Sequence, residues 1–268
     1  MSFRLALCQM AGSMDKDESR KTAEQFIRQA AEEGAQVISL PEMWDCPYSN
    51  DCFREYAEPA DGPTVEFMSR LAEELGIWLI GGSISELDGD RVYNTAFCFD
   101  PKGKVIGRHR KVHLFDIDVK DGIRFMESDT LTAGKDMTLL ETEFGEIGVA
   151  ICYDVRFPEW HRKMALAGAK LIVLPAAFNM TTGPAHWDLT MRARALDNQV
   201  YFAACAPARD EQGVYVAWGN SCIATPWGDF AAHADEKARI VAADIDFGRV
   251  DEIREQLPLL RHRKPELY

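Results

Sequence analysis

Three reactive side chains, Glu42, Lys111 and Cys152, each come directly after an apolar segment that reads as a β-strand. A thiol, a carboxylate and an ammonium group that meet at one carbonyl can cleave an amide. The carboxylate takes the thiol proton, the sulfur attacks the carbon, and the cation stabilises the charge that grows on the oxygen. Ligand sites of α/β sheets lie at the carboxyl ends of strands, so we expect the three side chains to converge on one pocket.

Each of these residues has an ordinary explanation when it is taken alone. Cys152 fits a buried structural thiol, Glu42 a helix cap, and Lys111 a surface charge. The sequence segments around these residues favour the catalytic interpretation. They resemble, in the same order and at similar separations, the three signatures of the nitrilase superfamily: PEMW at 41–44, RKVHL at 110–114 and ICYDVRFPE at 151–159.

The resemblance extends to one branch of that superfamily and covers nearly the whole chain. Five further segments are similar to the omega-amidases: 111–118, 178–187, 194–201, 206–210 and 261–268. The similarity implies a carbon-nitrogen hydrolase that acts on linear amides. It also implies a homodimer or a larger homo-oligomer.

The resemblance implies a role for each residue. Cys152 would form a covalent thioester, with Glu42 as the base. Lys111 and the backbone N–H of Tyr153 would face the oxyanion. Glu127 matches a second glutamate of the family, which positions the lysine and the substrate; its ordinary alternative is a loop carboxylate. No metal and no organic cofactor are expected.

Two histidines offer an alternative base, because Cys–His pairs are common in thiol hydrolases. His113 lies two residues after Lys111, and His186 begins a predicted helix. We favour structural hydrogen bonds for both of them.

The omega-amidase resemblance implies short 2-oxo dicarboxylic acid monoamides as substrates, such as 2-oxoglutaramate and 2-oxosuccinamate. Their free carboxylate requires a local cation, preferably an arginine with its bidentate fork. Three arginines are candidates, although each also fits an exposed helix residue: Arg156, Arg192 and Arg194. The other candidate substrate-binding residues are Phe178, Met180, His186 and Trp187, for which core packing is the usual alternative for the aromatic rings.

Other activities stay open from the sequence. A deaminated-glutathione amidase would use the same catalytic residues on a related small amide. Nitrile hydrolysis is a weaker alternative. A non-catalytic scaffold would keep the fold but has no need for Glu42, Lys111, Cys152 and Glu127 together.

Composition and charge narrow the partners and the compartment. The net charge of −13 argues against nucleic acid and anionic membranes, which attract basic patches. The N-terminal segment does not resemble a signal peptide, and no apolar run approaches the length of a membrane span. Seven scattered cysteines without a CxxC pair predict thiols in a reducing compartment rather than a zinc site. We therefore expect a cytoplasmic enzyme with a small-molecule amide as its partner.

The chain contains an internal repeat of its elements. Residues 34–41 read like 168–175, and 94–103 read like 220–228, in the same order. Two similar β/α halves, each with helices on one face, predict a four-layer α-β-β-α sandwich. We expect residues 1–268 to form a single carbon-nitrogen hydrolase domain.

The hydrophobic periodicity predicts the elements that position the reactive groups. Helical spacing predicts helices over 15–33, 64–75, 158–167 and 184–198. Apolar runs predict strands over 3–10, 36–40, 77–84, 147–151, 171–174, 201–206, 221–225 and 240–245, and a hairpin of 92–99 with 104–109.

Overall fold

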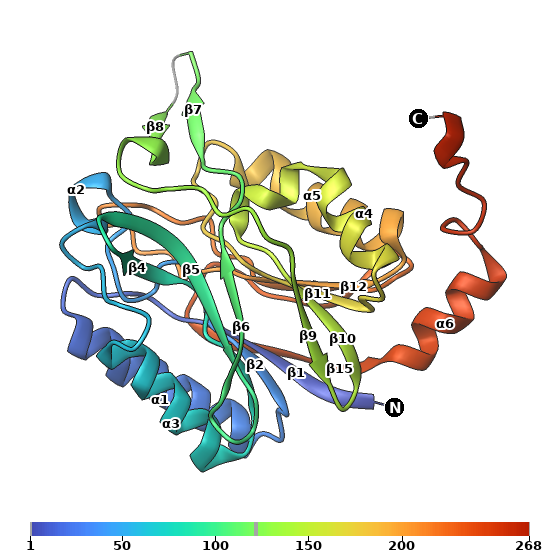
Figure 1. Cartoon of the computed structure of the whole chain (residues 1–268), viewed down its shortest axis with the longest axis horizontal. Helices are drawn as coiled ribbons and strands as arrows, with labels where there is room; N and C mark the ends of the chain where they lie inside the picture. The colour runs from blue at the N-terminus through green and yellow to red at the C-terminus, as the bar shows by residue number, and fades with distance from the viewer. Residues whose placement is uncertain (1, 121–122, 268) are drawn as a thin grey trace.

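The computed structural model describes residues 2–120 and 123–267, in which two β-sheets stack face to face between helices (Figure 1). The helices of this part of the chain are α1 Lys16–Glu32, α2 Asn50–Phe53, α3 Pro63–Leu75, α4 Pro158–Leu166, α5 Gly183–Asn198 and α6 Phe247–Gln256. Helices α1 and α3 cover the outer face of one sheet, and α4 and α5 cover the other. The predicted α-β-β-α sandwich is confirmed.

The first sheet has the strand order β15-β1-β2-β3-β5-β4, with β6 paired to β5. Its strands are β1 Ser2–Gln9, β2 Val37–Ser39, β3 Trp78–Ile80, β4 Ile84–Asp88, β5 Arg91–Phe99, β6 Val105–Arg110 and β15 Arg239–Asp246. Strands β1, β2 and β3 are parallel. Strand β15 runs antiparallel along the whole of β1. The last strand of the second half therefore completes the sheet of the first half.

The second sheet has the order β14-β13-β12-β11-β10-β9. Its strands are β9 Thr138–Thr142, β10 Gly145–Val149, β11 Leu171–Pro175, β12 Tyr201–Cys205, β13 Cys222–Ala224 and β14 Phe230–His233. Strands β10, β11 and β12 are parallel, so their carboxyl ends share one edge. The remaining short elements are the hairpin strands β7 Asp116–Asp118 and β8 Arg124–Met126, and the 3-10 helices η1 Glu127–Asp129, η2 Cys152–Arg156 and η3 Pro265–Leu267.

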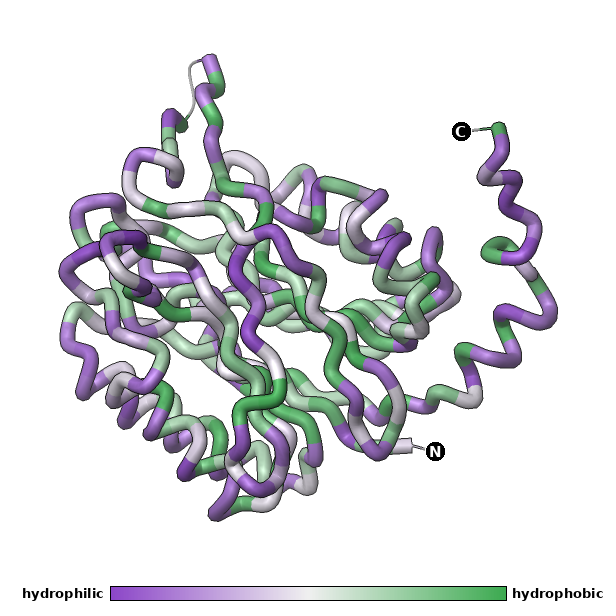
Figure 2. Tube along the Cα trace, in the orientation of Figure 1, coloured by the Kyte–Doolittle hydropathy of each residue, from purple (hydrophilic) through white to green (hydrophobic). Residues whose placement is uncertain are grey.

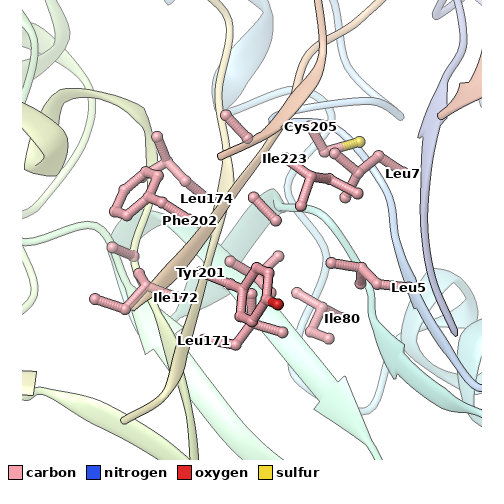
Figure 3. Packing of buried hydrophobic residues seen from close by; sticks show 14 of the residues in the cluster. Leu5, Leu7, Ile80, Leu171, Ile172, Leu174, Tyr201, Phe202, Cys205 and Ile223 are labelled. Atoms are coloured by element: carbon pink, nitrogen blue, oxygen red, sulfur yellow. The ribbon is translucent and has the colours of Figure 1, made fainter. Parts of the chain in front are cut away.

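The inner faces of the two sheets form the main core. Leu5, Leu7 and Ile80 of the first sheet lie in one buried cluster with Tyr201 and Ile223 of the second (Figure 3). Burial of each such aliphatic side chain contributes about 1.5–3 kcal/mol. Figure 2 shows the apolar strands inside and hydrophilic residues over the outer loops and helix surfaces. Among the described residues, no helix is long and apolar enough to cross a membrane.

Most predicted elements are found, but the predicted strand over 77–84 is wrong. The chain forms β3, turns at 81–83, and then begins β4. Gly82 has φ +64, a left-handed conformation that glycine adopts without strain. Because apolar residues flank the turn, the hydrophobic periodicity predicted one continuous strand here. Periodicity also missed α2, α6, β9 and β14, which are short or lie at the edges of the fold.

The turn at 81–83 holds the segment that carries Glu42. The Ser83 N–H donates to the carbonyl oxygen of Pro41 at 3.0 Å, and the Met43 N–H donates to Ser83 Oγ at 3.0 Å. A Cβ atom on Gly82 would lie 2.2 Å from the Pro41 carbonyl oxygen. A side chain at Gly82 would therefore push directly against the backbone next to Glu42.

We predict that Gly82→Ala lowers the free energy of unfolding by about 3 kcal/mol, because backbone strain and a backbone clash add. Gly89→Ala is the matched control, since Gly89 has φ +59 but a Cβ atom added to it would meet nothing within 4 Å. The control should cost only about 1 kcal/mol, the strain alone. Denaturant unfolding of both variants measures the difference, and equal losses would contradict the clash.

Candidate active site

A buried lysine joins two glutamates at the centre of the site. Lys111 follows β6, and its Nζ lies 2.9 Å from Glu42 Oε1 and 2.9 Å from Glu127 Oε1. All three side chains are buried. The structure thus brings together three of the residues singled out in the sequence, from segments far apart in the chain.

Backbone and side-chain donors fix both carboxylates. Glu42 Oε1 also accepts from Asn94 Nδ2 at 2.8 Å, and its Oε2 accepts from the Ala177 N–H at 2.8 Å. Glu127 Oε2 accepts from the Phe115 N–H at 2.7 Å. Each carboxylate therefore has a fixed orientation before any substrate binds.

Tyr48 links the two glutamates at the edge of this cluster. Its hydroxyl lies 2.5 Å from Glu127 Oε1, 3.2 Å from Glu42 Oε1 and 3.3 Å from Lys111 Nζ. Burial raises the pKa of the Tyr48 phenol well above its usual value, and the two carboxylates raise it further. The phenol therefore stays protonated and serves as a hydrogen-bond donor to the carboxylates.

The electrostatics of the cluster keep Lys111 charged. Burial alone acts to lower its pKa, but Glu127 and Glu42 outweigh that effect and raise the pKa above its ordinary value. Burial raises the pKa of Glu127, and Lys111 opposes this shift. A fixed cation thus stands beside the reacting groups at neutral pH.

Cys152 lies at the start of η2, just after β10, with a left-handed backbone at φ 41. Non-glycine residues adopt this conformation rarely, and it turns the side chain out of the strand direction. Burial raises the pKa of the Cys152 thiol well above its usual value, and the adjacent Glu42 carboxylate raises it further, by its charge and by a hydrogen bond. Lys111 and a hydrogen bond from the Ala177 N–H oppose the shift. The thiol is therefore protonated at rest, and the charges of Glu42 and Lys111 both act on it.

Asp154 holds the Cys152 turn against the strand that leads to Lys111. Its carboxylate accepts from the N–H of Ile151 at 3.0 Å and from the N–H of His113 at 2.9 Å. It also lies 3.2 Å from His109 Nε2 and 2.7 Å from His113 Nδ1. Burial acts to raise the pKa of Asp154, but hydrogen bonds from the two histidines lower it below its usual value.

The sequence patterns did not single out Asp154, Tyr48 or Asn94. Asp154 stands inside the quoted ICYDVRFPE segment, so a charged residue two positions after the cysteine was an available signal. Tyr48 and Asn94 lie in segments with no comparable signal. Tyr48 lies in the same segment as Glu42, and Asn94 reaches Glu42 from β5 of the same sheet as β2.

A second group of predicted residues surrounds an arginine next to η2. The guanidinium carbon of Arg156 lies 4.9 Å from the Phe178 ring centroid and 5.7 Å from the Tyr153 ring centroid. Its Nη1 lies 3.2 Å from Nδ1 of His186, in the first turns of α5. No carboxylate in the described part of the chain pairs with this guanidinium. The Tyr153 N–H belongs to the first turn of η2, where amides lack acceptors within the helix.

Other candidate residues lie farther from the reactive groups. Trp187 is fully buried behind Phe178, and its indole N–H donates to the Asn220 carbonyl oxygen at 2.7 Å. Met180 is exposed at the surface. The Nε atoms of Arg192 and Arg194 donate to backbone carbonyl oxygens at 2.5 and 2.8 Å, respectively.

The histidine alternatives have other partners. His113 bonds to Asp154 and stacks on Phe157 with ring centroids 3.7 Å apart. His186 contacts Arg156. Within residues 2–120 and 123–267, no cluster of three or more histidine, cysteine and carboxylate side chains is arranged to hold a metal ion.

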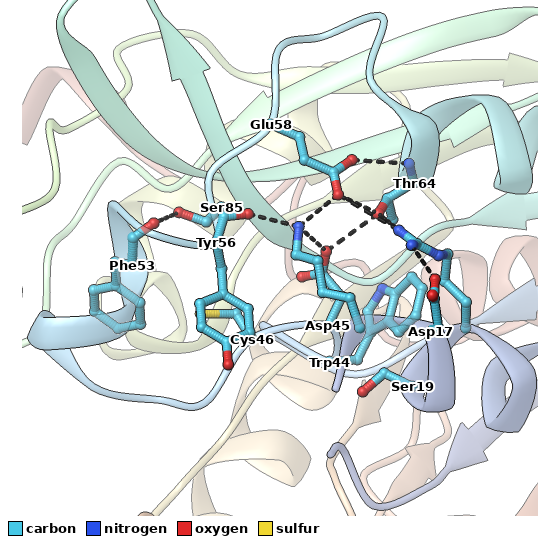
Figure 4. A network of polar contacts seen from close by, with 12 residues as sticks. Asp17, Ser19, Trp44, Asp45, Cys46, Phe53, Tyr56, Glu58, Thr64 and Ser85 are labelled. Atoms are coloured by element: carbon cyan, nitrogen blue, oxygen red, sulfur yellow. Dashed lines mark hydrogen bonds and ion pairs between the residues drawn. The ribbon is translucent and has the colours of Figure 1, made fainter. Parts of the chain in front are cut away.

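A polar network anchors the other side of the Glu42 segment (Figure 4). Lys16, at the start of α1, lies 3.1 Å from Asp45 Oδ2 and 2.5 Å from Glu58 Oε1. Glu58 also accepts from Thr64 Oγ1 at 2.9 Å. Burial raises the pKa of Asp45 to about 6, although Lys16 acts to lower it. Asp45 follows Glu42 by three residues, so this network fixes the far end of the turn.

We predict a pH-dependent loss of stability in Lys16→Met. A folded-state pKa of about 6, above the ordinary 3.8, means that ionising Asp45 costs stability as the pH rises from about 4 to 6. Lys16 limits that cost. Removing Lys16 should therefore lower the free energy of unfolding by about 3 kcal/mol at pH 8, and by less at pH 5, where Asp45 is mostly protonated.

Denaturant unfolding at both pH values measures this effect. The double variant Lys16→Met/Asp45→Asn is the control, because it has no carboxylate to ionise at position 45. The double variant should lose most of the difference between pH 5 and pH 8. An equal penalty at both pH values in the single variant would show that Asp45 is not the group involved.

Comparison with known proteins agrees with this geometry. The family model described as carbon-nitrogen hydrolase matches residues 4–255. The omega-amidase NIT2 of Xenopus tropicalis is 50% identical over 99% of this chain and 96% of its own length, and that of Homo sapiens is 47% identical over 100% and 97%. The crystal structure of Saccharomyces cerevisiae Nit3, a member of branch 10 of the nitrilase superfamily, superposes with a TM-score of 0.91 at 40% identity, covering 100% of this chain and 97% of Nit3. The chain therefore belongs to the carbon-nitrogen hydrolase family of the nitrilase superfamily and is a hydrolase of amide carbon–nitrogen bonds.

Proposed function

We propose that this enzyme is an omega-amidase that hydrolyses the terminal amide of short 2-oxo dicarboxylic acid monoamides, such as 2-oxoglutaramate and 2-oxosuccinamate, through a thioester on Cys152. The observation that carries the proposal is the buried Lys111 ammonium, which lies 2.9 Å from Glu42 Oε1 and 2.9 Å from Glu127 Oε1, with the charges of Lys111 and Glu42 acting on the buried Cys152 thiol. The names of the relatives, omega-amidases at 47–50% identity, support the substrate class.

The first half-reaction forms the thioester. Glu42 takes the proton from the Cys152 thiol as the sulfur attacks the amide carbon. The oxygen of the tetrahedral intermediate meets Lys111 Nζ and the Tyr153 N–H; one such donor is typically worth about 100- to 1,000-fold in rate. Glu42 then gives its proton to the nitrogen, the carbon–nitrogen bond breaks, and ammonia leaves.

The second half-reaction regenerates the enzyme. Glu42 takes a proton from water, the water oxygen attacks the thioester carbon, and the sulfur leaves as a thiol with the proton that Glu42 returns. Glu127 keeps Lys111 in place during both steps, because it accepts from the same ammonium group. These steps use only groups of the chain and water.

The substrate carboxylate would bind Arg156. This guanidinium lies over Phe178 and Tyr153, next to η2, with donors left over for a bidentate contact. Phe178 would contact the carbon chain of the substrate, with Trp187 behind it as a buried support. His186 would orient Arg156 through the contact at 3.2 Å. Met180 would contribute at most to the rim of the site.

We also propose the assembly and the compartment. Leu166, Leu189 and Leu196 are 50%, 70% and 40% exposed on the outer helices α4 and α5, which supports a homodimer or larger homo-oligomer through this face. All seven cysteines of the chain are free, which suits the cytoplasm. Residues 1–268 would act as a single carbon-nitrogen hydrolase domain, as the match over 4–255 supports.

Cys152→Ala and Glu42→Gln test the chemistry. Cys152→Ala should lower kcat by about 10,000-fold or more, because the nucleophile is lost. Glu42→Gln keeps the shape but cannot take a proton, and should lower kcat by about 100- to 10,000-fold. Ammonia release from 2-oxoglutaramate measures turnover, and mass spectrometry of the wild type should show an acyl adduct on Cys152. Normal turnover in Glu42→Gln would show that Glu42 is not the general base and would favour a histidine in that role.

Arg156→Met tests the substrate class. The variant should raise KM for 2-oxoglutaramate by about 10- to 100-fold, because a hydrogen-bonded charge is lost. KM for butyramide, which has no carboxylate, should not change. Arg192→Met serves as the control, since that side chain bonds to the Gly228 carbonyl oxygen on the far side of α5. Faster turnover of deaminated glutathione than of 2-oxoglutaramate by the wild type would contradict the assignment as an omega-amidase.

A further inference from the structure

A cavity of about 370 Å³ reaches Glu42. It lies between three segments, 11–14, 42–48 and 207–217. The first and the last follow β1 and β12, which face each other across the sandwich. Lys111 and Cys152 follow β6 and β10 instead. In the first sheet β2, which Glu42 follows, lies between β1 and the β5–β6 pair, and in the second sheet β11, which leads to Ala177, lies between β12 and β10.

The cavity touches the base but not the nucleophile. Glu42, Ala177, Tyr48 and Tyr215 line it, whereas neither Cys152 nor any residue of the Arg156 group does so in the described part of the chain. The rings of Tyr48 and Tyr215 lie 4.8 Å apart, and the Tyr215 hydroxyl donates to the Ala177 carbonyl oxygen at 2.5 Å. Two phenol groups therefore stand where the cavity meets the carboxylate.

The charge of the cavity excludes the acid end of the substrate. Two carboxylates, Glu42 and Asp210, belong to its lining. Within residues 2–120 and 123–267, no lysine and no arginine lines it. A substrate carboxylate placed there would meet like charges without a counter-ion. Water and ammonia, which are small and neutral, meet no such cost, and the volume has room for roughly ten water molecules.

We propose that this cavity is the nitrogen-side passage of the active site: it supplies water to Glu42 and takes away ammonia, while the amide substrate occupies the Arg156 side. The inference rests on the proposed thioester mechanism. When the carbon–nitrogen bond breaks, the nitrogen carries the proton from Glu42 and leaves as ammonia toward the cavity. Water then takes the same place, gives a proton to Glu42 and forms the new carbon–oxygen bond as the carbon–sulfur bond breaks.

Two variants narrow the passage from opposite sides. Ala11 and Val214 both line the cavity and are exposed, Val214 at 67%, so larger side chains fit there without disturbing the core. Ala11→Phe and Val214→Trp should each lower kcat for 2-oxoglutaramate about threefold or more, since water arrival or product escape becomes slow. Val105→Trp is the matched control, an exposed valine at the start of β6 outside the cavity lining, and should leave kcat unchanged.

A binding measurement separates the passage from a substrate pocket. In the Cys152→Ala background, the Kd of 2-oxoglutaramate should stay the same after Ala11→Phe or Val214→Trp, because the amide binds on the other side of Glu42. Calorimetry gives this constant, and circular dichroism confirms that each variant folds. A Kd weakened about tenfold would show that the cavity binds the amide itself. Unchanged kcat in both folded variants would show that neither water nor ammonia uses it.

A failure of the passage proposal can be distinguished from a failure of the proposed function. If the wild type releases no ammonia from any short amide and forms no adduct on Cys152, the mechanism fails first. If the wild type turns over and the narrowing variants behave like the Val105→Trp control, only the passage is overturned.

Discussion

The buried ammonium group of Lys111 constrains the rest of the site. An unpaired cation in a dry interior costs several kcal/mol, so its position is stable only while carboxylates contact it. Glu42 and Glu127 make those contacts at 2.9 Å each, and they come from different loops. Backbone N–H groups of Ala177 and Phe115 in turn fix the carboxylates. The packing of the two sheets therefore determines the catalytic geometry before a substrate arrives, and little reorganisation is left for the reaction itself.

Two carboxylates around one ammonium leave a surplus of negative charge beside Cys152. Burial of the sulfur and the Glu42 carboxylate both raise the pKa of the thiol, so the resting enzyme holds a neutral and poorly reactive cysteine. In the proposed mechanism, the thiolate is favoured only when the carbonyl oxygen becomes negative and shares Lys111. Proton transfer to Glu42 and attack on the carbon are thus coupled by electrostatics. A cysteine with a preformed thiolate would be reactive but open to oxidation, whereas this arrangement keeps the sulfur reduced between turnovers.

The sequence predicted the elements that carry Glu42, Lys111 and Cys152, because each follows a run of apolar residues with a clear period. The break of 77–84 at Gly82 was missed because Ile80 and Ile84 flank it, although Gly81-Gly82-Ser83 is a turn signal in the sequence. The sequence patterns also missed β15 as a partner of β1, since pairing between the two ends of a chain leaves no local pattern. Tyr48 and Asn94 were missed for a similar reason, since their contacts with Glu127 and Glu42 join residues 79 and 52 positions apart. Asp154 was overlooked although it lies inside the quoted segment 151–159.

The charges around the site also orient the substrate. The protein carries a net charge of −13, yet the proposed substrate is an anion, so attraction to the whole surface cannot drive binding. A local cation has to provide that attraction. Arg156 ends the short helix η2 that Cys152 begins, and its guanidinium lies near the rings of Phe178 and Tyr153. Glu42 and Asp210 line a cavity to which no lysine or arginine among residues 2–120 and 123–267 contributes. A reversed substrate would bring its carboxylate against those two acids and its nitrogen toward Arg156. In the proposed mechanism, the charges that bind the acid end therefore also determine which end of the molecule meets the sulfur.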